Sequence, residues 1–234
     1  MPDVFKEHVK NYARNHPPVY YAAHRLRGRD TDMAVDRDTQ LVIEGFPRTG
    51  NTFSVAAFRQ AQKEDVRLAH HLHAQAQVIR AARMRIPCLV LIRNPTDAVL
   101  SMRIRLPQFS TAQALLYYAS FYETARKYRS SYVLGHFEEV TADFGNVVEQ
   151  INTKFGTDFV SFEHTEANVS SIFSQIEEDY LSKGQKVGIA RPSNTRKDLK
   201  ESLREELETP KHERAVARAE AAYRALVSNN ADEV

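Results

Sequence analysis

The sequence predicts an α/β fold in three layers, with a mainly parallel β-sheet flanked by helices. Two short segments predict strands: 41–46 is an apolar run that ends in turn residues, and 88–92 is a continuous apolar run of the kind that is buried on both faces of a sheet. Each segment is followed by turn residues and then by a helical pattern. Strands that alternate with helices through short connections are typical of a parallel sheet with crossover helices.

Turn residues and hydrophobic periodicity divide the rest of the chain. Asn94 and Pro95 mark the start of a helix, because Asn is a favourable N-cap and Pro is favourable at the first helical position. The strands are expected at 41–46, 66–70, 88–92 and 132–137. The helices are expected at 53–62, 73–85, 94–106, 112–128, 140–155, 168–181, 196–207 and 212–226.

Length and composition favour one domain over residues 1–234, with an N-terminal helical segment at 1–38 and a frayed acidic tail at 228–234. The net charge of +2 is too small to suggest a partner nucleic acid or a membrane surface. No apolar stretch approaches the roughly 20 residues that span a bilayer. The single cysteine, Cys88, excludes an intrachain disulfide, and the polar N-terminus lacks a secretory signal, so a cytoplasmic location is expected.

The loop 45–52 has the glycine spacing and the final Thr of the nucleotide-binding loop Gly-x-x-x-x-Gly-Lys-Ser/Thr. Asn51 occupies its lysine position, and the basic residue is Arg48, three positions earlier. A loop between a strand and a helix N-terminus directs several backbone N–H groups at one point. With Arg48 and the hydroxyls of Thr49 and Thr52, these groups are expected to surround an anion in a P-loop-like, nucleotide-binding architecture. A plain strand-to-helix turn with a Thr cap is the alternative.

The segment 47–53 resembles the 5'-phosphosulfate loop of sulfotransferases, Pro-Lys-Ser-Gly-Thr-Thr-Trp, with Arg48 at the lysine position. Arg keeps the charge of Lys but presents it in a planar fork. The resemblance implies that Arg48 steadies the leaving phosphate during catalysis. It also implies that the cofactor contacts Arg48, Thr49, Gly50, Asn51, Thr52 and Phe53.

The segment 93–101 resembles the 3'-phosphate motif of the same family, Arg-Asn-Pro-x-Asp-x-x-x-Ser, and matches every specified position. Arg93 stands at the carboxyl end of a buried strand, where open α/β sheets bind their ligands. Ser101 lies in the following helix, whose side chains lean toward its N-terminus. Arg93 and Ser101 are therefore expected to hold one phosphate from two sides. The alternative is a salt bridge between Arg93 and Asp97, with Ser101 an ordinary surface residue.

Three histidines, His70, His71 and His73, lie between the two motifs, and histidine suits proton transfer at neutral pH. Sulfotransferases use a His in a Thr-His-Leu-Pro segment as the base, and the corresponding position, 22 residues before Arg93, is His71. His73 and then His70 are the reserves for this role. A zinc site is a competing interpretation, but no metal is expected because no further ligand completes a four-ligand set. The remaining alternative is that the histidines are structural.

A basic loop at 188–197 occupies the place of the late sulfotransferase loop that folds over the nucleotide. Arg191 and Arg196 are the expected cofactor contacts there, with Ser193 possible and a solvated basic turn as the alternative.

The resemblance, which spans 41 to about 197, implies sulfonate transfer from 3'-phosphoadenosine 5'-phosphosulfate (PAPS) to a hydroxyl group, with adenosine 3',5'-bisphosphate (PAP) as product. The acceptor would be a carbohydrate, a lipid-linked glycan, or a small alcohol or phenol. The alternatives are a P-loop kinase or nucleotide hydrolase and a non-catalytic nucleotide-binding protein of the same fold. Asn51 and Arg93 disfavour the kinase or hydrolase, because they stand where its lysine and its Mg²⁺-binding Asp would be.

Overall fold

The computed structural model describes residues 2–28, 32–182, 184 and 194–228. Its sheet has four parallel strands in the order β2-β1-β3-β4. They are β1 (Leu41–Gly45), β2 (Leu68–His70), β3 (Cys88–Ile92) and β4 (Val133–His136). The helices are α1 (Pro2–Arg14), α2 (Pro17–Leu26), α3 (Asn51–Ala61), α4 (Gln75–Met84), α5 (Pro95–Arg105), α6 (Thr111–Arg126), α7 (Phe137–Ala142), α8 (Phe144–Phe155), α9 (Glu166–Ser182), α10 (Asn194–Leu207) and α11 (Glu213–Val227). A short 3-10 helix, η1 (Arg129–Ser131), precedes β4.

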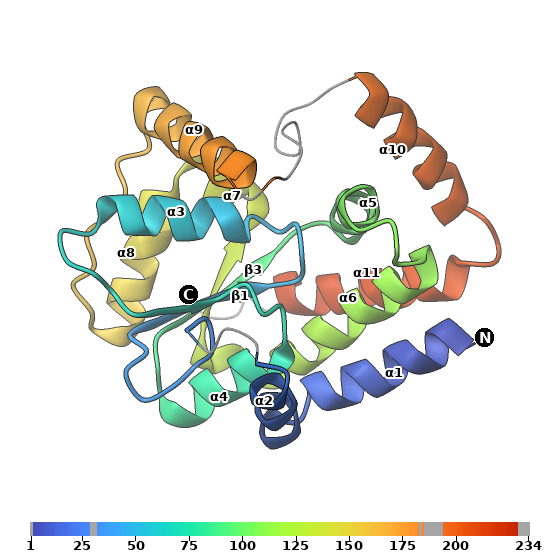
Figure 1. The fold of residues 1–234 in the computed structure, drawn as a ribbon, viewed down its shortest axis with the longest axis horizontal. Helices are drawn as coiled ribbons and strands as arrows, with labels where there is room; N and C mark the ends of the chain where they lie inside the picture. Colours follow the sequence, from blue (N-terminus) through green and yellow to red (C-terminus); the bar gives the residue numbers. More distant parts are fainter. Residues whose placement is uncertain (1, 29–31, 183, 185–193, 229–234) are drawn as a thin grey trace.

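Helices cover both faces of the sheet, which confirms the predicted three-layer α/β fold (Figure 1). Val42 and Val90 point to the face that is packed by α4, α5, α6 and α11. Ile43 and Leu91 point to the opposite face, which is packed by α3, α8 and α9. Because successive side chains of a strand alternate between faces, strands buried on both sides are mostly apolar, and the buried Glu44 of β1 is an exception.

The register of the strands brings three loops to one edge of the sheet. Ile43 of β1 is opposite Leu89 of β3 on one side and His70 of β2 on the other. All three strands are parallel, so the loops that follow them leave at the same edge. These loops carry both phosphate motifs and the histidines, which are separated in the sequence.

The predicted helix 140–155 is wrong in one respect, because the structure contains two helices there, α7 and α8. The break falls at Asp143, whose carboxylate accepts a hydrogen bond from Asn146 N–H at 3.2 Å and so caps α8. Gly145, in the first turn of α8, lies against the Phe162 backbone, where an added Cβ would lie 2.4 Å from the Phe162 carbonyl oxygen.

Replacing Asp143 with Ala removes the cap and should destabilise the protein by about 1 kcal/mol, whereas Asp143→Asn should cost only a few tenths, roughly, because Asn also caps well. Urea unfolding followed by circular dichroism measures both differences. Equal destabilisation by the two substitutions would show that the cap is not what sets this boundary.

Candidate anion-binding and catalytic site

The loop between β1 and α3 is held in a tight turn by its own side chains. The Thr49 hydroxyl donates to the Phe46 carbonyl at 2.8 Å, and Asn51 Nδ2 donates to the same oxygen at 3.2 Å. Gly45 is required here, because an added Cβ would lie 2.6 Å from the Leu91 carbonyl oxygen. The turn ends at Gly50, the N-cap of α3, whose φ of 98° is in the left-handed region that favours glycine.

These hydrogen bonds within the loop limit which of its groups are available to a ligand. The side chains of Thr49 and Asn51 are buried and hydrogen-bonded within the loop, so they are not exposed to a ligand at the sheet edge. Phe53 is also buried, and its ring packs with Phe144 and Phe173 in the core on the α3 side of the sheet. The free backbone N–H groups of the first turn of α3 are therefore the groups of this loop that could bind an anion.

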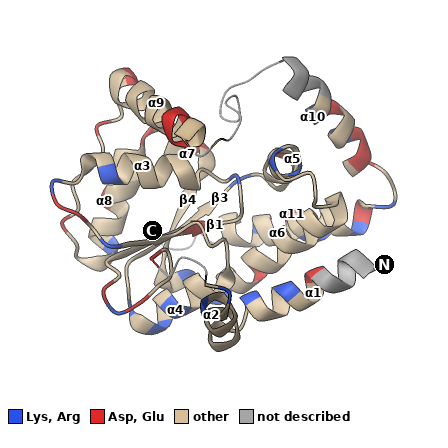
Figure 2. Cartoon of the chain, viewed as in Figure 1, with Lys and Arg blue, Asp and Glu red and all other residues tan. Residues whose placement is uncertain are grey.

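The structure brings Arg48, Arg93 and Ser101 together. Arg48 Nε donates to the Ser101 hydroxyl at 3.1 Å, and Arg93 Nη1 donates to the Arg48 carbonyl at 3.3 Å. The Arg93 guanidinium also lies 3.9 Å from the centre of the Phe137 ring. Burial lowers the pKa of Arg93, against the opposing effect of Asp97 and Glu138. Figure 2 shows Lys and Arg in blue on the connection from the sheet to α5 and on part of α5 itself.

The structure pairs Asp97 with a residue that the sequence analysis missed. Lys200 of α10 contacts the Asp97 carboxylate at 2.8 Å, so the Arg93–Asp97 salt bridge considered above is not the pairing that forms. Asp97 thereby ties α10 to α5 beside Ser101. No signal in the sequence links positions 97 and 200, which meet only through the packing of these two helices.

Three tyrosines of α6 support the loops of the site. Tyr118 donates to the Arg93 carbonyl at 2.6 Å, Tyr122 donates to the Leu91 carbonyl at 2.7 Å, and Tyr117 donates to the His73 carbonyl. All three are buried, and burial raises the pKa of each hydroxyl. The choice of Tyr over Phe at buried helical positions was the available sequence signal for these bonds.

A buried carboxylate holds the histidine loop. Glu44, which lies in β1 and is fully buried, accepts hydrogen bonds from Leu72 N–H at 2.8 Å and His73 N–H at 3.0 Å. Burial raises the pKa of Glu44 to about 8, although these backbone bonds oppose the shift. The bonds help to hold His71 and His73 at φ values of 58° and 49°, which are uncommon for residues other than glycine. A lone Glu inside an apolar strand was the sequence signal for this role.

A chain of hydrogen bonds determines which His71 nitrogen carries a proton. Arg59 Nη2 lies 3.2 Å from His70 Nε2, and His70 Nδ1 lies 2.7 Å from His71 Nδ1. Because Arg can only donate, neutral His70 accepts at Nε2 and donates from Nδ1 to His71. His71 then carries its proton on Nε2 and donates to the Thr52 hydroxyl at 3.2 Å. His71 Nε2 is thus a donor in this arrangement.

His73 has the opposite tautomer. Its Nδ1 lies 2.8 Å from the Gly45 carbonyl, which can only accept, so the proton is on Nδ1 and Nε2 is an acceptor. Burial lowers the pKa of His73 to about 4, with the cations Arg14 and Arg48 acting in the same direction. His73 is therefore neutral at neutral pH, with a lone pair on Nε2.

The C-terminal candidates cannot be placed in this site. Arg191 and Ser193 lie outside the described residues, as does the side chain of Arg196 in α10. Within the part of the chain that is described, no three His, Cys, Asp or Glu side chains are grouped as metal ligands. Over the same residues, no helix has the length and apolar character needed to cross a membrane.

Fold and site together define an α/β protein with two basic loops at one edge of a parallel sheet. No family model matches the chain, and no curated protein matches it. Among solved structures it is similar to mouse sulfotransferase SULT7A1 complexed with PAP, with 13% sequence identity over 70% of each chain and a TM-score of 0.42. A likeness this distant establishes neither the family nor the activity of this chain, which must be inferred from the residues of the site.

The shifted pKa values of Glu44 and His73 should act on stability in opposite directions. His73 titrates near 4 instead of 6.5, so its effect is to increase stability as pH rises between those values. Glu44 titrates near 8 instead of 4.5, so its effect is to decrease stability over that interval. Between pH 4.5 and 6.5 the two effects on the free energy of unfolding offset each other. From pH 6.5 to 8 the decrease due to Glu44 remains, at up to about 1.4 kcal/mol per pH unit.

Urea unfolding at a series of pH values tests this expectation. In Glu44→Gln the free energy of unfolding should change little between pH 6.5 and 8. The exposed control Glu149→Gln should show the same decrease as the wild type. Parallel profiles for the wild type and Glu44→Gln would mean that Glu44 does not titrate in this range.

Proposed function

We propose that this chain is a sulfotransferase that moves a sulfonate group from PAPS to a hydroxyl group of an acceptor. The observation that carries the proposal is the meeting of Arg48, Ser101 and Arg93. These residues belong to two motifs that resemble the 5'-phosphosulfate and 3'-phosphate sites of one nucleotide. Their closeness at the carboxyl edge of the sheet supports the proposal that both motifs contact one PAPS molecule.

The donor groups at this edge fit a nucleotide with phosphates at both ends of its ribose. Arg48 and the first-turn N–H groups of α3 would hold the 5'-phosphosulfate, while Arg93 and Ser101 would hold the 3'-phosphate. Hydrogen bonds between such groups and phosphate contribute about 1.5–3 kcal/mol each. Because Asp97 is paired with Lys200, it does not neutralise Arg93 by a direct ion pair.

The hydrogen-bond directions favour His73 as the general base, in place of His71, which the resemblance indicates, while the lowered pKa of His73 makes it a weaker base than a free imidazole. PAPS supplies a sulfonate on a good leaving group. As the acceptor oxygen forms its bond to sulfur, the bond between sulfur and the bridging phosphate oxygen breaks, and His73 Nε2 takes the hydroxyl proton. Arg48 and the loop N–H groups stabilise the charge that develops on the departing phosphate. His71 would act by orienting the Thr52 hydroxyl.

The proposal extends to the whole chain. Residues 1–234 would form one domain that acts in the cytoplasm on a carbohydrate, a lipid-linked glycan, or a small alcohol or phenol. Neither a metal nor a nucleic acid has a part in this scheme.

PAP should raise the melting temperature without magnesium, whereas ATP with magnesium should have little effect. At a hundredfold excess over its Kd, PAP should stabilise the protein by about 2.7 kcal/mol. Arg93→Gln should weaken PAP binding by about 10- to 100-fold. Arg83→Gln, an exposed control on α4, should not. Stabilisation by ATP with magnesium and not by PAP would favour a kinase or hydrolase instead.

His73→Gln should lower the turnover number by about 10²–10⁴-fold while PAP affinity changes little, because only proton transfer is lost. His71→Gln should have a smaller effect, within about tenfold, since one orienting hydrogen bond is removed. Turnover can be followed with radiolabelled sulfonate donor and an acceptor found by screening carbohydrates, alcohols and phenols. A larger loss of turnover in His71→Gln than in His73→Gln would identify His71 as the general base instead.

A further inference from the structure

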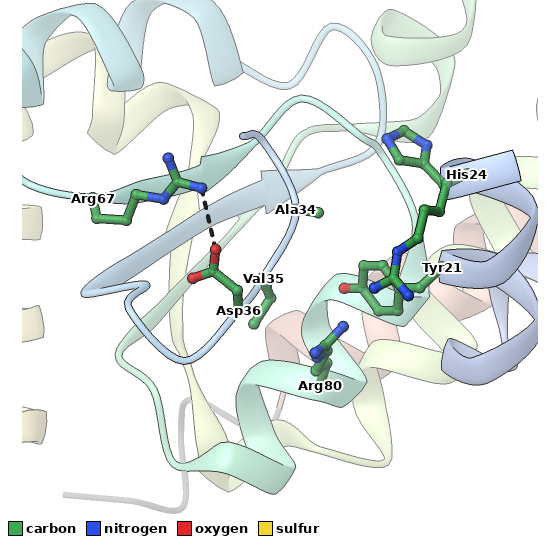
Figure 3. A pocket seen from close by; sticks show the side chains of 8 residues that line it. Tyr21, His24, Ala34, Val35, Asp36, Arg67 and Arg80 are labelled. Carbon is green, nitrogen blue, oxygen red and sulfur yellow. Dashed lines mark hydrogen bonds and ion pairs between the residues drawn. The ribbon is translucent and has the colours of Figure 1, made fainter. Parts of the chain in front are cut away.

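A second basic pocket lies beside β2, between α2, α4 and the segment before β1 (Figure 3). Its volume is about 250 Å³. The residues that line it include none of Arg48, Arg93 and Ser101, so it is separate from the proposed nucleotide site. The proposed nucleotide site therefore does not explain this pocket.

One wall of the pocket is apolar and firmly held. Ala34 and Val35 are buried and lie beside the ring of Tyr21. The Tyr21 hydroxyl donates to Gln77 Oε1 at 2.6 Å, and the same oxygen accepts a bond from Val35 N–H at 2.9 Å. Gln77 is fully buried and also donates to the Met33 carbonyl at 2.8 Å. Tyr21 is thus fixed in position before any ligand binds, which lowers the entropic cost of binding.

The rest of the lining has an excess of positive charge. Arg67 contacts the carboxylates of Asp36 at 3.1 Å and Asp32 at 3.5 Å, so its charge is compensated. Arg25 and Arg80 also line the pocket, and neither forms an ion pair with any residue in the described ranges. The Arg80 guanidinium lies 4.5 Å from the centre of the Tyr21 ring. One guanidinium group over an aromatic ring and a second arginine in the same lining favour an oxyanion attached to a flat group.

We propose that this pocket binds a small ring compound that carries one phosphate or sulfate group. The ring packs against Tyr21, Ala34 and Val35, and the oxyanion lies between Arg25 and Arg80. The size is adequate, since a cavity of about 150 Å³ holds a benzene ring. The larger volume of this pocket leaves space for the charged group.

Isothermal titration calorimetry with phenyl phosphate and phenyl sulfate tests the proposal and shows which oxyanion binds more tightly. We expect saturable binding at one site, with an affinity about 10-fold lower in Arg80→Gln. Arg83→Gln, on the same helix but outside the pocket lining, should bind like the wild type. Arg93→Gln should also bind normally, because it alters only the proposed nucleotide site, so this result does not depend on whether PAP binds.

The proposal would be overturned by no saturable binding of either ester, by equal losses of affinity in Arg80→Gln and Arg83→Gln, or by a loss of affinity in Arg93→Gln. Binding of uncharged benzyl alcohol with the same affinity would also contradict it, because the arginines would then contribute nothing. Far-ultraviolet circular dichroism checks that each variant is folded. If Arg80→Gln does not fold, Arg25→Gln provides the same test at an exposed position.

Discussion

The hydrogen bonds from α6 to the backbone of the loops are the constraint on which the rest of the site depends. Tyr117, Tyr118 and Tyr122 donate to carbonyls at or just beyond the ends of the strands, and Phe46 packs edge-on against two of their rings. A strand end has carbonyl groups that the sheet does not satisfy, and burying them without partners is costly. By satisfying them, one helix fixes the histidine loop and the start of the Arg93 motif relative to each other.

Glu44 adds a second, less favourable constraint. Burying a carboxylate costs free energy that a neutral side chain would not, and the raised pKa of Glu44 reflects that cost. In return, its two oxygens bind consecutive backbone N–H groups and help to hold His71 and His73 in left-handed conformations. Local destabilisation of this type is characteristic of sites where geometry matters more than stability.

The arginines of the site also carry a cost in free energy. Arg93 is linked to the Arg48 backbone carbonyl by a hydrogen bond, and its burial lowers its pKa, so holding this cation away from water has a cost in free energy. Such an arrangement is most stable when an anion lies between or beside the cations. The pocket at Arg25 and Arg80 has a similar excess of positive charge among its lining residues, on another surface of the molecule.

The sequence by itself determined the strands, most helices and the two basic motifs, because these depend on hydrophobic runs, caps and spacings within a few residues. The helix boundary at Asp143 was not predicted, because the apolar pattern of the helices gave no sign of the cap that Asp143 forms. Only the tertiary structure decided the pairings of Glu44 with the histidine loop, of Tyr118 with the Arg93 carbonyl, and of Asp97 with Lys200. The contacts that indicate the tautomers of His71 and His73 also form only in the tertiary structure. Hydrogen bonds between residues far apart in the chain are set by packing geometry, which no local pattern records.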